Sequence, residues 1–147
     1  MKKKWIIIIA GIVIVGLALA IIGYNYVFQG QPDFADMEPE HKIRAKRLYN
    51  DFTENTGLAT ERYVGSQGKM IQIEGPISKV ELVDSIAVLV YSYNEGMFGD
   101  EGISVTMLPQ FTDEAKRLSK LKSIKVKGLC TGYNDTDVIM IHGSLVK

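Results

Sequence analysis

The stretch KMIQIEGPISKVELVD, residues Lys69–Asp84, decides how this chain folds. Polar residues alternate with isoleucines before Gly75-Pro76, and the alternation resumes at Ile77. This pattern predicts one long strand that bends at its middle. A bent strand can pair at its two ends with different parts of a small sheet, so we expect it to belong to both halves of a barrel.

Two further strands are predicted directly after the bend. In Ile86–Tyr93 alternate residues predict two faces that are both largely apolar. In Ile103–Leu108 apolar residues alternate with polar ones. We expect them to form a hairpin around the loop NEGMFGDEG, residues 94–102.

A short helix and two last strands complete the predicted barrel. Thr112, followed by two acidic residues, is typical of a helix start, and the apolar positions of this helix are Ala115, Leu118 and Leu121. The last strands are Ser123–Tyr133, with Cys130 pointing inward, and Val138–Val146. The polar turn NDTD joins them.

A helix is predicted before the bent strand. Pro39 suits its first turn, and its buried face follows helical spacing through Ala45, Leu48, Tyr49 and Phe52. Gly57 is a plausible stop, and Leu58–Tyr63 extends the helical pattern by another turn.

The order of these elements predicts the fold class. Five short strands with a helix between the third and fourth have the connectivity of the OB fold. The sequence therefore predicts a mainly β protein: a five-stranded OB-fold barrel, preceded by an amphipathic helix and by an N-terminal transmembrane helix.

The N-terminal region is strongly apolar. Trp5–Phe28 holds 24 residues without a charge, which as a helix spans roughly 36 Å and is enough to cross a bilayer. Three lysines precede this run and acidic residues follow it, so the positive-inside rule predicts a cytoplasmic N-terminus. We expect residues 1–28 to form a signal-anchor in the cytoplasmic (inner) membrane, 29–37 a linker, and 38–147 an extracytoplasmic OB-fold domain.

A cleaved signal peptide is the alternative interpretation of the apolar run. Ala18-Leu19-Ala20 has the small-x-small form of a cleavage site. The run continues beyond Ala20 through Ile22 to Phe28, which is longer than an ordinary signal core and favours an uncleaved anchor. Both interpretations export the same domain.

Charge and cysteine content exclude some classes of protein. Lys+Arg and Asp+Glu both number 17, and three of the lysines precede the apolar run, so the rest of the chain is net acidic. This balance argues against nucleic-acid binding, because neutralisation of phosphates dominates such affinity. Cys130 is the single cysteine, so no intramolecular disulfide can form.

The best candidate ligand-binding surface is the second and third strands with the loop between them, as is usual for OB folds. Aromatic side chains there could stack on bases, sugar rings or peptide side chains. The alternative is that the tyrosines pack under the first helix. The candidate residues are Leu89, Tyr91, Tyr93, Met97, Phe98, Ser104 and Thr106.

A basic cluster follows on the second helix and fourth strand. It could meet anionic headgroups, an acidic partner or single-stranded nucleic acid, or it could be a solvated face. Its members are Lys116, Arg117, Lys120, Lys122, Lys125 and Lys127.

The sequence offers no recognisable catalytic set. The histidines His41 and His142 lack a partner motif, and the acidic loops around Asp100 and Asp135 lack the spacing of an EF-hand. We therefore expect no metal site, no cofactor and no enzymatic activity.

Several segments resemble a known family. They are AKRLYNDF, residues 45–52; GKMIQIEGPISKVEL, residues 68–82; and IKVKGLCTGYNDTDVIMI, residues 124–141. They are similar to the tRNA-anticodon-binding-domain-like OB family of small exported bacterial proteins. The resemblance covers roughly Arg44 to the C-terminus and implies the OB fold, but no activity or catalytic residues.

These observations lead to one functional hypothesis and one alternative. We expect a membrane-tethered, extracytoplasmic OB-fold binding module that recognises a protein or an envelope glycan. The alternative is a single-stranded nucleic-acid-binding OB domain.

Overall fold

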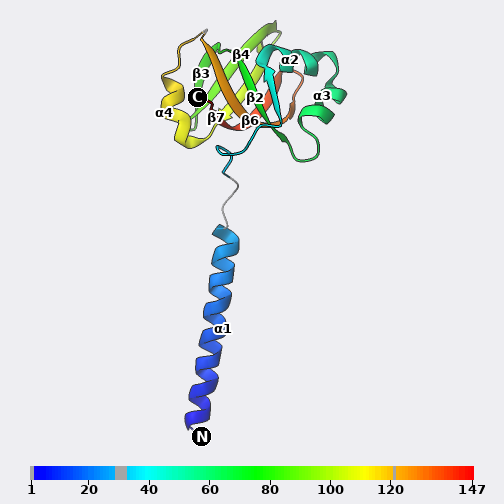
Figure 1. Ribbon diagram of the computed structural model, residues 1–147. Helices are drawn as coiled ribbons and strands as arrows, with labels where there is room; N and C mark the ends of the chain where they lie inside the picture. Colours follow the sequence, from blue (N-terminus) through cyan, green and yellow to red (C-terminus); the bar gives the residue numbers. More distant parts are fainter. Residues whose placement is uncertain (1, 29–32, 121) are drawn as a thin grey trace. The chain divides into compact units, whose positions relative to one another are not determined.

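The structure is a computed structural model that describes residues 2–28, 33–120 and 122–147. The chain forms two units, Met1–Asp33 and Phe34–Lys147. Figure 1 shows the path of the chain through both.

The first unit contains α1 (Lys2–Phe28), a single continuous helix. Residues Lys2–Tyr26 are long and apolar enough to cross a membrane, a test that a signal sequence near the N-terminus also passes. The predicted apolar N-terminal helix is therefore confirmed as a helix.

The second unit is built on a curved sheet that contains seven strands among the described residues. Its order is β1-β2-β6-β7-β5-β4-β3. The β1–β2 and β5–β7 pairs are parallel and the other pairs are antiparallel. The strands are β1 (His41–Arg44), β2 (Lys69–Pro76), β3 (Lys79–Val83), β4 (Ile86–Gly96), β5 (Gly99–Met107), β6 (Ser123–Tyr133) and β7 (Asp137–Leu145).

The predicted bent strand is present as two strands. β2 ends at Pro76 and pairs with β6, whereas β3 begins at Lys79 and pairs with β4 near the other end of the sheet order. Ile77 is fully buried, and the Ser78 N–H donates to the carbonyl of Val90 at 2.8 Å. The chain itself therefore links the two halves of the OB-like sheet. The sheet is open rather than a five-stranded closed barrel.

The hairpin differs from its prediction. The expected long loop at residues 94–102 is mostly strand, because β4 and β5 continue to a two-residue turn at Met97-Phe98. A register shift between Ser92 and Asn94 marks a bulge, which the regular alternation of the sequence does not reveal.

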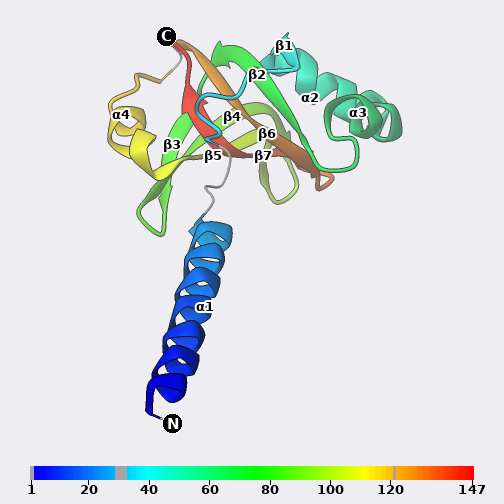
Figure 2. The same ribbon diagram turned by 60° about the horizontal axis from the view of Figure 1, so that its bottom comes forward.

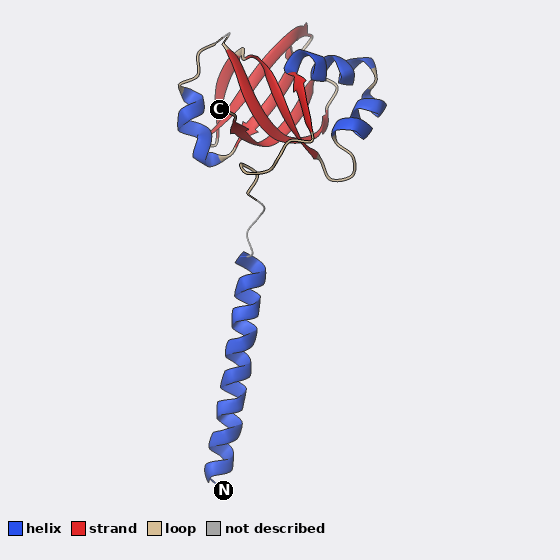
Figure 3. Ribbon diagram, viewed as in Figure 1, coloured by secondary structure: helices blue, strands red, loops and turns tan. Residues whose placement is uncertain are grey.

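Two helices cover one end of the sheet and a third covers the other (Figures 1 and 2). The first end carries α2 (Ala45–Glu54) and α3 (Thr56–Tyr63), and the second carries a 3-10 turn (Pro109–Phe111) followed by α4 (Thr112–Lys116). Figure 3 distinguishes these helices from the strands by colour.

The buried face of α2 is the one that its sequence predicts. Ala45, Leu48 and Phe52 are fully buried, and Tyr49 is nearly so. The start of this helix was predicted wrongly, however. Pro39 precedes β1, and α2 begins only at Ala45, because residues 41–44 pair with β2 as a strand.

Asn55 separates α2 from α3, so Gly57 is not the stop that the sequence suggests. The Asn55 side chain accepts a hydrogen bond from the Leu58 N–H at 3.1 Å and caps the second helix. At the other end of the sheet, α4 starts at Thr112 as predicted but stops at Lys116. Leu121, predicted on its apolar face, lies outside the described residues.

The end of the predicted linker contacts the domain. The ring of Phe34 stacks on His142 with centroids 3.9 Å apart, and the Lys127 ammonium donates to the Met37 carbonyl at 2.9 Å. These residues lie within the second unit. Residues 29–32 of the predicted linker lie outside the described residues.

Candidate functional site

The predicted ligand face does not exist as one surface. Leu89 and Tyr91 are fully buried, and Tyr93 is half-buried with its ring 5.7 Å from that of Tyr49 on α2. The prediction that Leu89 and Tyr91 face outward is wrong, and Tyr93 packs against α2, as in the alternative that places the tyrosines under the first helix. Alternation alone does not say which face of a strand points toward the core.

Ser104 and Thr106 lie on the opposite face of the sheet. They pair with Val90 and Val88, whereas Leu89 and Tyr91 pair with the buried residues of β5. Met97 and Phe98 form the tip of the hairpin and are 91% and 93% exposed. The seven candidate residues are therefore divided between the core, the outer face and the tip.

The basic cluster is also dispersed. Lys116 forms an ion pair with Asp113 at 3.6 Å, and the Arg117 Nε donates to the Asp113 carbonyl at 3.2 Å. Lys120 and Lys122 are exposed between α4 and β6. Lys125 lies on the outer face of β6, as does Lys127, and the latter is held by the Met37 carbonyl.

The residues weighed for catalysis or metal binding occupy structural positions. His41 packs edge-on against Tyr63, and the Asp137 carboxylate accepts from the Gly102 N–H at 2.9 Å. Cys130 is buried, and burial raises the pKa of its thiol to about 12. Within the described part of the chain, no group of three or more His, Cys, Asp or Glu residues could hold a metal ion.

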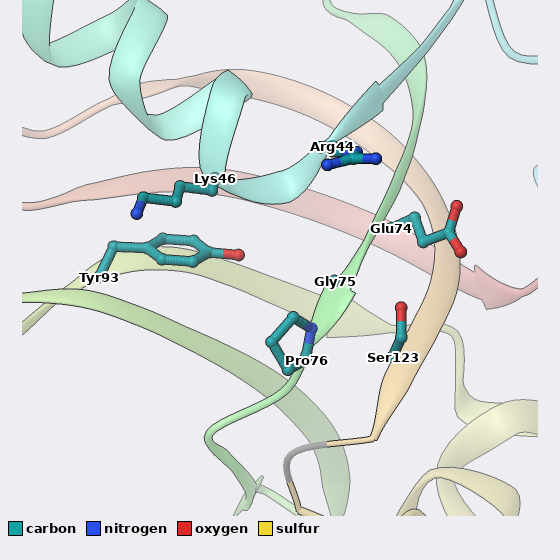
Figure 4. A pocket seen from close by; sticks show the side chains of 7 residues that line it. All are labelled: Arg44, Lys46, Glu74, Gly75, Pro76, Tyr93 and Ser123. Carbon is teal, nitrogen blue, oxygen red and sulfur yellow. The ribbon is translucent and has the colours of Figure 1, made fainter.

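The structure instead forms a groove where the chain bends at Gly75-Pro76. We call it the bend groove; its volume is about 400 Å³. The side chains around it come from four separate segments (Figure 4). Its lining residues are Arg44, Lys46, Glu74, Gly75, Pro76, Tyr93 and Ser123.

One wall of the bend groove is the N-terminus of α2. The residue that precedes this helix is Arg44, and its side chain provides no cap; the first turn holds no acidic residue. The free N–H groups and the helix dipole therefore give this wall a partial positive charge. Lys46 and Arg47, both exposed, add full positive charges in the same turn.

Tyr93 supplies an uncharged donor to the groove. Its hydroxyl oxygen is buried and has no hydrogen-bond partner among the described residues. Burial raises the pKa of Tyr93 to about 12, so the group stays protonated at neutral pH. Figure 4 shows this hydroxyl pointing between Arg44 and Gly75.

Gly75 makes room for this arrangement. A Cβ atom at this position would lie 3.2 Å from both the Tyr93 hydroxyl and the Ala45 side chain. Both contacts are tighter than ordinary packing, so a larger residue would push the tyrosine or α2 away from the strand.

The remaining groups fix the charge of the groove. Glu74 lies between Arg44 and Lys125 in the cross-strand register of β1, β2 and β6. No ion pair joins these side chains, and within the described residues Arg44 and Lys46 have no side-chain hydrogen bond. Two cations thus line the groove without a side-chain partner in the described part of the chain.

A second, adjoining hollow of about 360 Å³ follows β1. It is lined by His41, Lys42, Ile43, Arg44, Arg47 and Tyr63. Arg44 lines both hollows, so the positive surface continues from the bend groove along β1.

The family model described as tRNA_anti-like matches residues 1–145. The chain belongs to the tRNA_anti-like family. The match extends well beyond the region from Arg44 onward that carried the resemblance in the sequence. No curated protein sequence matches the chain significantly.

Among solved structures, the chain is similar to a proposed nucleic acid-binding lipoprotein from Klebsiella pneumoniae. The TM-score is 0.53 at 15% identity, over 80% of this chain and 98% of that one. At this identity the likeness shows the fold alone.

Two further structures have lower scores. The S. pombe Stn1–Ten1 complex matches with a TM-score of 0.38 and 17% identity, over 58% of this chain and 67% of that chain. Yeast Stn1 and Ten1 match with a TM-score of 0.37 and 12% identity, over 77% of this chain and 65% of that chain.

This member of the family carries a signal for the groove that sequence reasoning missed. The segment HKIRAKR, residues 41–47, contains four of the cations described above within six positions. A helix that began at Pro39 would have placed all four inside a helix. Their significance depends on the helix starting at Ala45, which places its positive end against the bend of β2.

Proposed function

We propose that this protein is a membrane-anchored, extracytoplasmic binding module that holds a protein or envelope glycan ligand in the bend groove. The observation that carries the proposal is that Arg44 and Lys46, whose side chains have no partner among the described residues, line one groove together with Tyr93. Polar groups gathered in a groove without protein partners are typical of ligand sites.

Binding rather than catalysis agrees with the chemistry of the lining. With its pKa near 12, Tyr93 does not act as a base at neutral pH, and Arg44 keeps its charge at any physiological pH. These groups can hold and orient a ligand. A hydrolase activity of the purified protein that is lost in Tyr93→Phe would contradict this part of the proposal.

The extracytoplasmic location rests on the N-terminal helix and its flanks. Lys2, Lys3 and Lys4 precede the apolar run, and Tyr24 and Tyr26 lie near its other end, as interfacial aromatics do. A reporter fused after Lys147 should be active only outside the cytoplasm. Activity of a cytoplasmic reporter at the same position would refute the orientation.

Retention of the anchor is tested separately. Mass spectrometry of the mature protein should find the intact N-terminal segment. A new N-terminus at Ile21 would show cleavage after Ala20, which removes the anchor but leaves the exported domain unchanged.

A single-stranded nucleic-acid binder is the second candidate function. It is favoured by the fold likeness to the Klebsiella pneumoniae lipoprotein, which is described as a proposed nucleic acid-binding protein. Salt dependence separates the two candidates, because displacement of counterions makes oligonucleotide affinity fall steeply with ionic strength. Tight, strongly salt-dependent oligonucleotide binding would favour this alternative.

The main experiment captures the ligand in intact cells. A photo-crosslinking amino acid replaces Ser123, an exposed lining residue of the bend groove, and a matched control replaces Ser66, which is exposed in the loop between α3 and β2. We expect a specific crosslinked product at position 123 that is absent at position 66. The product should disappear when Arg44 and Lys46 are both changed to glutamine. Equal products at both positions would reject the groove as the binding site.

A further inference from the structure

We propose that the bend groove binds the phosphate of a phosphodiester-linked glycan or polyol, an anionic polymer of the cell envelope. This inference rests on the function proposed above and specifies its ligand. It is carried by three features of the groove: its charge, the directions of its donors, and the position of one carboxylate.

The charge of the groove favours a singly charged anion. Arg44 and Lys46 together outweigh Glu74 by one positive charge, and a phosphodiester carries one negative charge. The wall formed by α2 adds the positive end of the helix dipole. Cations in the first turn of a helix are unfavourable there unless an anion is bound, so this wall is suited to a phosphate.

The side chains that could donate to a ligand come from different elements, and Figure 4 shows the Lys46 ammonium at the end of the Tyr93 ring away from the hydroxyl. Arg44 comes from the end of β1, Lys46 from α2, Tyr93 from β4 and Ser123 from the start of β6. A tetrahedral phosphate has acceptor oxygens that point in several directions, whereas the two oxygens of a carboxylate lie in one plane. Arg44 can also donate two parallel hydrogen bonds to a phosphate.

The unpartnered hydroxyl of Tyr93 supports the same ligand independently of the charges. Burial of a polar group without a hydrogen bond is costly, and a phosphate oxygen would supply the missing acceptor once a small movement of the surrounding side chains opens the hydroxyl to the groove. Tyr91, whose hydroxyl is also buried and unpartnered, is its near neighbour on β4.

Glu74 discriminates between kinds of phosphate. Its carboxylate lies on the rim of the groove and repels a doubly charged phosphate monoester. It can accept a hydrogen bond from a hydroxyl group of the sugar or polyol next to a diester. Pro76 and the ring of Tyr93 provide apolar surface for the carbons of that unit.

The test uses the full-length chain in a maltoside detergent, which contains no phosphate. Binding of a glycerol-phosphate hexamer is measured by calorimetry and compared with hexaglutamate, a dT6 oligonucleotide and monomeric dihexanoyl phosphatidylglycerol. We expect the hexamer to bind at least about tenfold more tightly than each of the other three probes. The variants Arg44→Gln and Lys46→Gln should each weaken it about fivefold to tenfold, as expected for loss of a charge-assisted contact.

Two variants complete the design. Tyr93→Phe removes the hydroxyl alone and should weaken the hexamer without changing the melting temperature by more than a few degrees. Lys120→Gln removes a cation of equal charge that lies outside the groove and should leave affinity within twofold.

Each other result overturns the inference in a distinct way. Equal binding of hexaglutamate would show that the groove takes any polyanion. Tightest binding of dT6 would assign it to nucleic acid, and tightest binding of the lipid would assign it to a headgroup. If no probe binds while the Ser123 crosslink forms in cells, the phosphate assignment fails and the proposed binding function stands. Wild-type affinity in all groove variants would place the phosphate site elsewhere.

Discussion

Truncation of Phe52 tests how α2 is used. The sequence allows two roles for the apolar face of this helix: packing on the sheet or waiting for a partner. In the structure the Phe52 side chain is fully buried, with its ring centroid 6.0 Å from that of Tyr63 and 5.8 Å from that of Tyr133. Phe52→Ala should therefore leave a cavity at the end of the sheet that α2 covers.

The size of the effect follows from this burial. Removal of a fully buried phenylalanine side chain costs about 3–5 kcal/mol, because the transfer free energy and the contacts around the cavity are both lost. In a domain of this size each kcal/mol lowers the melting temperature by roughly 3–6 °C, so we expect a decrease of about 10–30 °C.

The assay is thermal unfolding of the fragment Phe34–Lys147, which contains the described hydrophobic core. Leu58→Ala is the matched control, since this side chain on the neighbouring α3 is 58% exposed and should cost less than about 1 kcal/mol. A decrease below 3 °C for Phe52→Ala, with the helix content retained, would refute the packing of α2 described here.

Two further predictions concern the close packing of the hairpin and the buried titratable groups. In Gly102→Ala, the new Cβ atom would overlap the carbonyl oxygen of Tyr91, so we expect the free energy of unfolding, measured by chemical denaturation, to fall by about 1–3 kcal/mol or more. The control is Gly57→Ala, whose Cβ atom would meet only an ordinary contact at 3.6 Å. This variant should be neutral or stabilising. An equal effect of the two substitutions would contradict the packing of β4 on β5. Burial raises the pKa of Tyr93 and of Cys130 to about 12, from ordinary values of 10.0 and 9.0. Above those ordinary values the unfolded chain loses protons that the native state keeps, so the melting temperature should fall as pH rises from about 9 to 12, and Cys130→Ala should reduce the fall. A melting temperature that stays constant over this range would refute the burial of these groups.

Local patterns determined much of the domain. The helical spacing of Leu48, Tyr49 and Phe52 identified the buried face of α2, since side chains three and four positions apart share one side of a helix. The alternation in Lys69–Val83, with its interruption at Gly75-Pro76, located the two strands that join the halves of the sheet. Each of these features is set within a few residues of the chain.

The orientation of β4 could not be obtained in this way. Alternation separated Leu89, Tyr91 and Tyr93 from Val88 and Val90 correctly, but both sets are apolar enough to face a core. The choice between them depends on what covers each face, and α2 contributes Tyr49 to the side on which Tyr93 lies. The bulge after Ser92 and the two-residue turn likewise depend on pairing with β5.

By itself, the sequence determined the apolar N-terminal helix, the order of the main strands and the buried side of α2, because helix and strand periodicities are local properties. The tertiary structure alone decided the bend groove. Arg44, Gly75, Tyr93 and Ser123 are far apart in the chain, and they meet because β1 pairs with β2, β2 pairs with β6, and α2 packs over the inner face of β4. A site built from such pairings has no local pattern, since its geometry exists only after distant strands have paired on both sides of the bend at Gly75-Pro76.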